Sequence, residues 1–365
     1  DDLNEIQRYV DNVPKKESIN EMSLLTESSK PDPFETLVSE CFIIGCEKKN
    51  LKKYLSDRKV DFTFVYNKVI AGDEQPCKDI VSFFSPFNQQ LRTRRILNTV
   101  TKLNTLLFQD DVKNKQSEFF VISLSSNINT DGIYDIPDML KESNPNLFYY
   151  YYCVRVDDFF IREDEAGEFM NDVIDFHFHP KYYVFKTLYP LSPMFQELLY
   201  SILAHIRRKR MGKFMNHIEG GKVNVQALAS IDSENIKAIE TEVMEKITAQ
   251  LLSLKNFDKF NSELIVQSPY LSLKYTTPIK KNASFVDADY GLFQVLNMIT
   301  FEDFLFIYFS IIQELHVVFV SESPGLTTAA LTTFLALMRP FRWPLPIIFN
   351  LPEDLLPMLS SPVPV

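Results

Sequence analysis

Short runs of apolar, aromatic and β-branched residues follow one another between residues 34 and 190, and they predict β-strands. The runs are Phe42–Cys46, Asp61–Tyr66, Ile80–Phe84, Phe119–Leu124, Phe148–Val156 and Tyr182–Leu188. Asp131-Gly132 is a turn signal between two of them. This succession of strands predicts an antiparallel meander. Before it, residues 1–33 are rich in charged residues and serine and predict a flexible tail.

From Ser192 onward the apolar positions change to a helical spacing. Apolar residues recur every three or four positions over 195–206 and again over 236–254, so both segments predict amphipathic helices. The basic run Arg207–Arg210 ends the first helix and has two interpretations. It is either a solvated helix end that complements the helix dipole or a patch for phosphate or lipid. The second helix is interpreted as part of a linker between two modules.

Helix and strand signals alternate in the last hundred residues. Thr300 and Asp303 form a capping-box-like start to the first helix. The predicted elements are helix Phe301–Glu314, strand His316–Ser321, helix Leu326–Met338, strand Leu345–Phe349 and helix Asp354–Leu359. Because two strands joined through a helix usually pair in parallel by a right-handed crossover, we expect an α/β layer here.

The composition narrows the classes of function. The chain has 38 Lys and Arg against 48 Asp and Glu, a net charge of −10, which disfavours a protein that mainly binds nucleic acid. Only 9 residues are Gly, and neither G-x-G-x-x-G nor G-x-x-x-x-G-K-[ST] occurs, which disfavours a nucleotide-hydrolysing or dinucleotide enzyme. The 4 cysteines are too few for a disulfide framework and fit a reduced, cytoplasmic setting. No apolar run reaches the length that crosses a bilayer.

Few residues offer bond-making chemistry. No G-x-S-x-G motif occurs, and His316 is interpreted as the first residue of a strand rather than as a catalytic base. On a strand, His177 and His179 would face the same side, where both could ligate a metal together with Asp172 or Asp175. The alternative interpretation is an ordinary strand face. We therefore expect no covalent catalysis and no cofactor.

One ordered series of motifs is specific enough to indicate a family. The series consists of His316–Ser321, Leu326-Thr327, Ala329–Leu331, Leu337–Trp343, Ile347–Pro352, Leu355-Leu356 and Ser361–Pro364. This order resembles the central part of the DENN domain, and the single Trp lies where that family places one. Upstream, Tyr183–Leu203 is similar to the end of the family's upstream module, and Phe119–Leu124 with Tyr150–Val156 fits its sheet.

The resemblance implies a mixed α/β protein with two lobes. A longin-like N-terminal lobe would be joined by a helical linker to a three-layer α/β C-terminal lobe. On this basis we expect a tail over 1–33, an upstream module over 34–206, a linker over 207–262 and a central module over 263–365. The family's downstream module is not represented, so we expect the central module to be incomplete at its C-terminal end.

The resemblance also implies a function, because many members of the family are guanine nucleotide exchange factors for Rab GTPases. We expect such an activity on a Rab-family GTPase, in the cytoplasm and on vesicle or endosomal membranes reached through a recruiting protein. Ligands of parallel sheets gather beyond the carboxyl ends of the strands. This places the expected GTPase contacts at Ser321, Glu322, Ser323 and Asn350, each of which also has an interpretation as a strand or helix cap.

Two alternative functions remain open at this point. A GTPase-activating relative of the family would need an exposed loop arginine, for which Arg92, Arg94 and Arg95 are the candidates. The other alternative is a non-catalytic scaffold that binds a GTPase or a coat component.

Overall fold

The structure is a computed structural model of the 365-residue chain. It describes residues 32–57, 60–71, 80–84, 91–99, 101–102, 117–125, 135–161, 173–216, 218–219, 222–223, 235–268, 271–341, 343 and 347–360. The predicted turn at Asp131-Gly132, Asp172 and nearly all of the predicted tail lie outside these residues.

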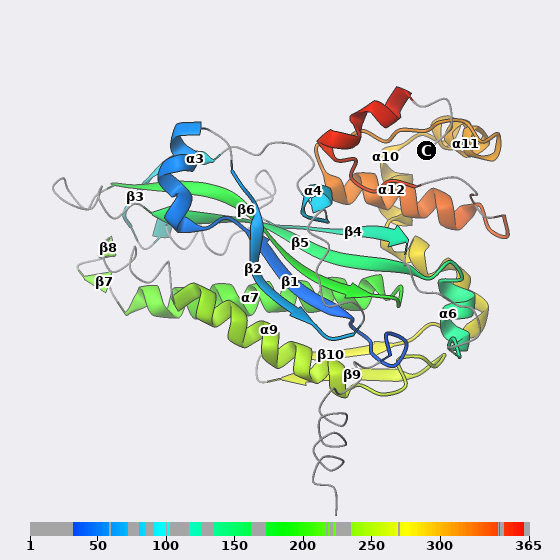
Figure 1. Ribbon diagram of the computed structural model, residues 1–365, viewed down its shortest axis with the longest axis horizontal. Coiled ribbons are helices and arrows are strands. Elements are labelled where there is room, and N and C mark those ends of the chain that lie inside the picture. The colour runs from blue at the N-terminus through cyan, green and yellow to red at the C-terminus, as the bar shows by residue number, and fades with distance from the viewer. Residues whose placement is uncertain are drawn as a thin grey trace, which may run out of the picture.

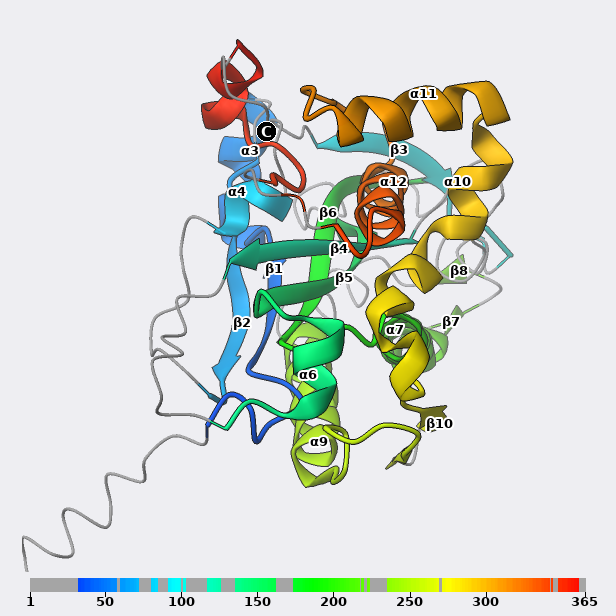
Figure 2. The ribbon, with the colours of Figure 1, turned by 90° about the vertical axis from the view of Figure 1, so that its right-hand side faces the viewer.

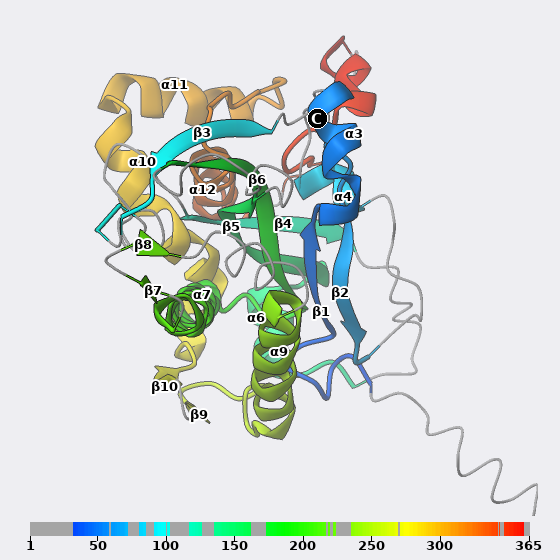
Figure 3. The ribbon, with the colours of Figure 1, turned by 90° about the vertical axis from the view of Figure 1, so that its left-hand side faces the viewer.

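A six-stranded antiparallel sheet forms the centre of the first half (Figure 1). Its strands are β1 (Glu40–Gly45), β2 (Thr63–Val69), β3 (Arg92–Leu97), β4 (Ser117–Ser125), β5 (Phe148–Ile161) and β6 (Val173–Thr187). The order is β2-β1-β6-β5-β4, and β3 pairs with the first half of β6. β3 therefore lies at the end of the sheet that faces the viewer in Figure 3. The predicted antiparallel sheet is confirmed, but β1 sits between β2 and β6, so the order is not a simple meander.

Two long helices cover one face of this sheet (Figure 1). They are α7 (Ser192–Met215) and α9 (Asn235–Ser253), as the helical spacing predicts. Their apolar sides, such as Leu198 on α7 and Val243 on α9, are fully buried in one core with Tyr152 and Phe185 of the sheet. The hairpin of β9 (Glu263–Ser268) and β10 (Leu271–Thr276) extends this layer.

The opposite face of the sheet has a smaller aromatic core. Phe42, Phe120 and Tyr182 pack there against Phe84 of the short helix α4 (Ile80–Phe84). The prediction of a strand at 80–84 was wrong. Ile80 and Phe84 stand four residues apart and are both buried, which is the spacing of one helical turn and is indistinguishable from a strand in so short an apolar run.

Most of the remaining helices gather beside β4, which forms one edge of the sheet (Figure 2). They are η3 (Lys280–Tyr290), α10 (Leu292–Met298), α11 (Phe301–Ile312), α12 (Pro324–Leu337) and η4 (Glu353–Ser360), with α6 (Asp138–Ser143) nearby. Smaller elements are η1 (Lys48–Asn50), α3 (Leu51–Asp57), β7 (Ile218–Glu219) and β8 (Lys222–Val223). The predicted cap of α11 is confirmed, because the Thr300 hydroxyl accepts a hydrogen bond from the Asp303 amide at 3.1 Å.

The mixed α/β class is confirmed, but the expected parallel sheet near the C-terminus is wrong for the residues described. Residues 316–320 and 347–348 are assigned to no strand, and 345–346 lie outside the described part. The main chain of Val317–Val320 makes no backbone hydrogen bond within the described chain. An apolar β-branched run favours extended backbone, but a strand also needs a neighbour to complete its ladder.

Candidate functional site

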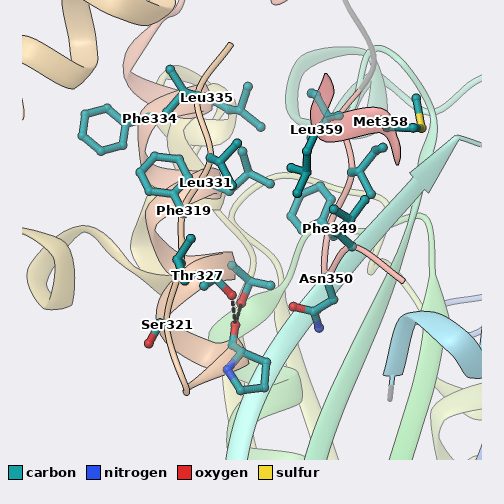
Figure 4. Close-up of a pocket in the computed structure, with 18 of the residues that line it drawn as sticks. Phe319, Ser321, Thr327, Leu331, Phe334, Leu335, Phe349, Asn350, Met358 and Leu359 are labelled. Atoms are coloured by element: carbon teal, nitrogen blue, oxygen red, sulfur yellow. Dashed lines mark hydrogen bonds between the residues drawn. The ribbon is translucent and has the colours of Figure 1, made fainter. Parts of the chain in front are cut away.

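A pocket of about 360 Å³ lies between α12 and the segments on either side of it (Figure 4). Phe319 and Leu331 line one side, and Phe349 and Leu359 line the other. The volume falls within the range of small-ligand pockets, and its walls are mostly apolar. A second hollow of about 660 Å³ shares Phe349 and Trp343 with it and extends toward α6. The predicted contact residues are therefore next to a hollow, apolar surface.

The loop before α12 holds three of those predicted contact residues. Ser321 and Glu322 are exposed and line the pocket. The Ser321 hydroxyl accepts a hydrogen bond from the Ser323 amide at 3.1 Å. Ser323 is the N-cap of α12, because its hydroxyl accepts from the Leu326 amide at 3.2 Å. Ser323 therefore has the geometry of a helix cap, while Ser321 and Glu322 are accessible to a partner.

Asn350, the fourth predicted residue, lies on the Phe349 side of the pocket (Figure 4). Its backbone has a φ of 48°, in the left-handed region that Asn tolerates better than most residues. Its side-chain nitrogen is buried and has no hydrogen-bond partner within the described chain. An amide left in this state favours an external acceptor, because a buried unpaired donor costs about 1–3 kcal/mol.

Two charged residues of the site were missed by the sequence analysis because they come from the upstream sheet. Glu118 on β4 and Arg155 on β5 lie directly opposite each other in the ladder. Arg155 lines the pocket, whereas Glu118 accepts hydrogen bonds from Ser323 and, at 2.9 Å, from the Gly325 amide. Glu118 lies 205 positions before Ser323, so no local sequence pattern reveals this arrangement.

The match to a known family covers the half of the chain that builds most of this pocket. Residues 193–365 match the family model of the DENN (AEX-3) domain. The chain contains a DENN domain. No curated protein matches the chain. The match supports a Rab-related function in membrane traffic. Glu118 and Arg155 lie outside the matched residues, so the pocket combines the DENN match with the upstream sheet.

A buried network of charges joins that upstream sheet to the first helices of the DENN match. The Lys181 ammonium lies 2.5 Å from Asp158 and 2.9 Å from Glu240, and Arg210 lies 2.6 Å from Asp158. Tyr183 donates a hydrogen bond to Glu240 at 2.7 Å. Burial by itself would raise the pKa of Asp158, but the charges of Lys181 and Arg210 outweigh it and hold that pKa well below its usual range. The network is balanced in charge and connects β5, β6, α7 and α9.

The two histidines considered as metal ligands are in or near this network. Burial lowers the pKa of His179 to about 4, so its ring is neutral at pH 7, and it stacks on Phe160 with ring centroids 4.2 Å apart. His177 shares a hydrogen bond of 2.9 Å with Thr93. Asp175 forms an ion pair with Arg95 at 2.8 Å. Among the described residues, no group of three His, Cys, Asp or Glu side chains is arranged to hold a metal.

The three arginines considered for GTPase activation all lie on strand β3 rather than in a loop. Arg92 and Arg95 form ion pairs with Asp157 and Asp175, and Arg94 lies over the ring of Phe178 at 5.8 Å. Within the described residues, no helix is long and apolar enough to cross a lipid bilayer.

Proposed function

We propose that the protein is a guanine nucleotide exchange factor for a Rab-family GTPase and promotes release of GDP. The observation that carries the proposal is the DENN match over residues 193–365. Exchange works by binding rather than by bond-making, so it requires no nucleophile, general base or cofactor. The accessible loop of Ser321 and Glu322 beside an apolar pocket is the kind of surface that such binding uses.

The energetics of exchange follow from linkage. A protein that binds the nucleotide-free GTPase more tightly than the GDP-bound form weakens GDP binding by the same factor. Weakening GDP binding by about a thousandfold requires about 4 kcal/mol of differential binding. That energy would come from contacts made only with the nucleotide-free form, and we assign Glu322, Ser321 and Asn350 to these contacts. Ser323 would support the loop as its cap.

The proposal also divides the whole chain into modules. The antiparallel sheet with its helices would be a longin-like upstream module over 34–206, followed by a linker over 207–262 and a central module over 263–365. The protein would act in the cytoplasm and reach vesicle or endosomal membranes through a protein that recruits it.

The test is release of a fluorescent GDP analogue from a panel of purified Rab GTPases. We expect at least one GTPase to lose the analogue faster in proportion to the concentration of the protein. Binding without faster release would replace the proposal with a scaffold role, and faster GTP hydrolysis would replace it with GTPase activation.

A charge reversal at Glu322 tests the site itself. Glu322→Arg introduces a long cation into an exposed position of the contact loop, and we expect release to slow by at least tenfold while the melting temperature stays unchanged. The matched control is Glu197→Arg, on an exposed position of α7 that lines neither hollow. Equal release rates for the two variants would remove Glu322 from the site.

A further inference from the structure

The N-terminus of α12 is attached to the edge of the upstream sheet by one carboxylate. A single oxygen of Glu118 accepts hydrogen bonds from the Ser323 hydroxyl and from the Gly325 amide, the latter at 2.9 Å. Amides at the start of a helix have no partner within the helix and carry the positive end of its dipole. A carboxylate is therefore the side chain best suited to this position, and its hydrogen bonds are stronger than those of a neutral acceptor.

The main chains of the two elements also approach closely at the same place. A Cβ atom added to Gly325 would lie 2.8 Å from the Phe119 carbonyl oxygen and 2.8 Å from the Glu118 carboxylate. The Tyr290 hydroxyl lies 3.1 Å from the carbonyl oxygens of both Phe119 and Gly325. The junction thus depends on a glycine, a carboxylate and a tyrosine hydroxyl, supplied by three separate parts of the chain.

This junction lies at the base of the loop that contains Ser321 and Glu322. The loop is connected internally by the hydrogen bond from the Ser323 amide to the Ser321 hydroxyl. Ser323 is in turn bonded to Glu118. Ser321 is thus one hydrogen bond away from the residue that Glu118 fixes.

We propose that Glu118 is a positioning residue for nucleotide exchange, which fixes the Ser321–Ser323 loop relative to the upstream sheet. The inference rests on the proposed function, because the loop matters for exchange only if it contacts the GTPase. Without the carboxylate, α12 keeps the Ser323 cap but loses both hydrogen bonds to the Glu118 side chain on β4. The loop then samples positions in which its contacts with the nucleotide-free GTPase are not made together.

The experiment compares Glu118→Ala with Glu118→Gln. The glutamine retains the shape and one acceptor oxygen but lacks the charge, so it tests rescue by a conservative variant. Glu197→Ala, at an exposed position of α7, is the matched control. Three quantities are measured for each: the melting temperature, the hydrogen-exchange rate of the amides of residues 321–327, and the release rate of the fluorescent GDP analogue at a saturating concentration of the protein.

We expect Glu118→Ala to increase amide exchange in residues 321–327 by at least tenfold and to slow saturated GDP release by at least tenfold. Glu118→Gln should lie between this variant and the unchanged protein in both measurements, and Glu197→Ala should match the unchanged protein. If the alanine variant fails to fold, the glutamine variant decides the outcome alone.

The two ways of failing are separable. If the unchanged protein releases GDP from none of the GTPases, the proposed function fails, and the positioning role falls with it even where amide exchange responds to the variants. If the unchanged protein is active, the positioning role is wrong when release by the glutamine and alanine variants is unaltered. It is equally wrong when release slows with no change in amide exchange, because Glu118 would then act by another route.

Discussion

Replacing Lys181 by Met tests the buried charge network most directly. Met has a similar length and no charge, so the change removes the ammonium that bridges Asp158 and Glu240 with little loss of packing. Asp158 keeps its ion pair with Arg210, and Glu240 keeps the hydrogen bond from Tyr183. Two carboxylates then share one cation in a region where side chains are less than a tenth exposed.

The expected cost follows from breaking a buried ion pair on one side only. Such changes destabilise by about 3–5 kcal/mol, because a buried charge is left without compensation. For a folding unit of this size, each kcal/mol lowers the melting temperature by roughly 2–4 °C, so the decrease should be about 6–20 °C. The control is Lys246→Met, which removes an exposed pair with Glu242 and should cost less than about 1 kcal/mol.

The pH dependence distinguishes this account from a simple loss of packing. The pKa of Asp158 in the folded protein lies well below that of the unfolded chain, so its stabilisation is present above about pH 4 and is lost as pH falls through the folded pKa. Without Lys181, that pKa rises and the stabilisation decreases. The difference in melting temperature between the unchanged protein and Lys181→Met should therefore be larger at pH 7 than at about pH 2, as followed by circular dichroism. A difference that is the same at both pH values, or below 2 °C at pH 7, would refute the reasoning.

Two further predictions concern packing and reactivity. Gly325→Ala should lower the free energy of unfolding by about 1–3 kcal/mol, because the new Cβ has no room against β4. Gly212→Ala on helix α7 should raise it by about 0.5–1 kcal/mol, because nothing lies within 4 Å of the new Cβ there. Chemical denaturation of both variants measures the difference, and equal effects would contradict the close approach of Gly325 to β4. Burial raises the pKa of the Cys41 thiol to about 11, that of Cys46 to about 12 and that of Cys153 well above its usual value. None of these three thiols should therefore react with a thiol reagent at pH 8 until the protein is denatured.

The sequence predicts those parts of the fold that depend on local pattern. The apolar spacing of α7 and α9 and the aromatic runs of β4 and β5 identify these elements. The predicted end of α7 at Arg210 was wrong, because the helix continues to Met215, and β5 continues past Val156 to Ile161. The start of β6 was missed although Asp175 and His177 alternate with apolar residues, because Pro180 interrupts the run and argues against one continuous strand. Burial of Lys181 against Glu240 explains why a charged residue lies inside that strand.

The site is harder to predict because its geometry depends on contacts that are distant in sequence. Ser321, Glu322 and Asn350 could be predicted because each comes directly after an apolar run, and all three line the pocket. The contributions of Glu118 and Arg155 become visible only once β4 and β5 lie beside α12. Periodic patterns along the sequence report only local contacts, so they do not reveal a contact between residues about two hundred positions apart.

The extended segment Val317–Val320 has a practical consequence for work in solution. Val320 is 89 % exposed, and the neighbouring helix α11 presents Phe306 at 75 % exposure. An apolar stretch with open amide and carbonyl groups pairs readily with a copy of itself. Concentrated samples should therefore associate into larger species, and the specific activity measured in them should decrease as the sample is made more concentrated.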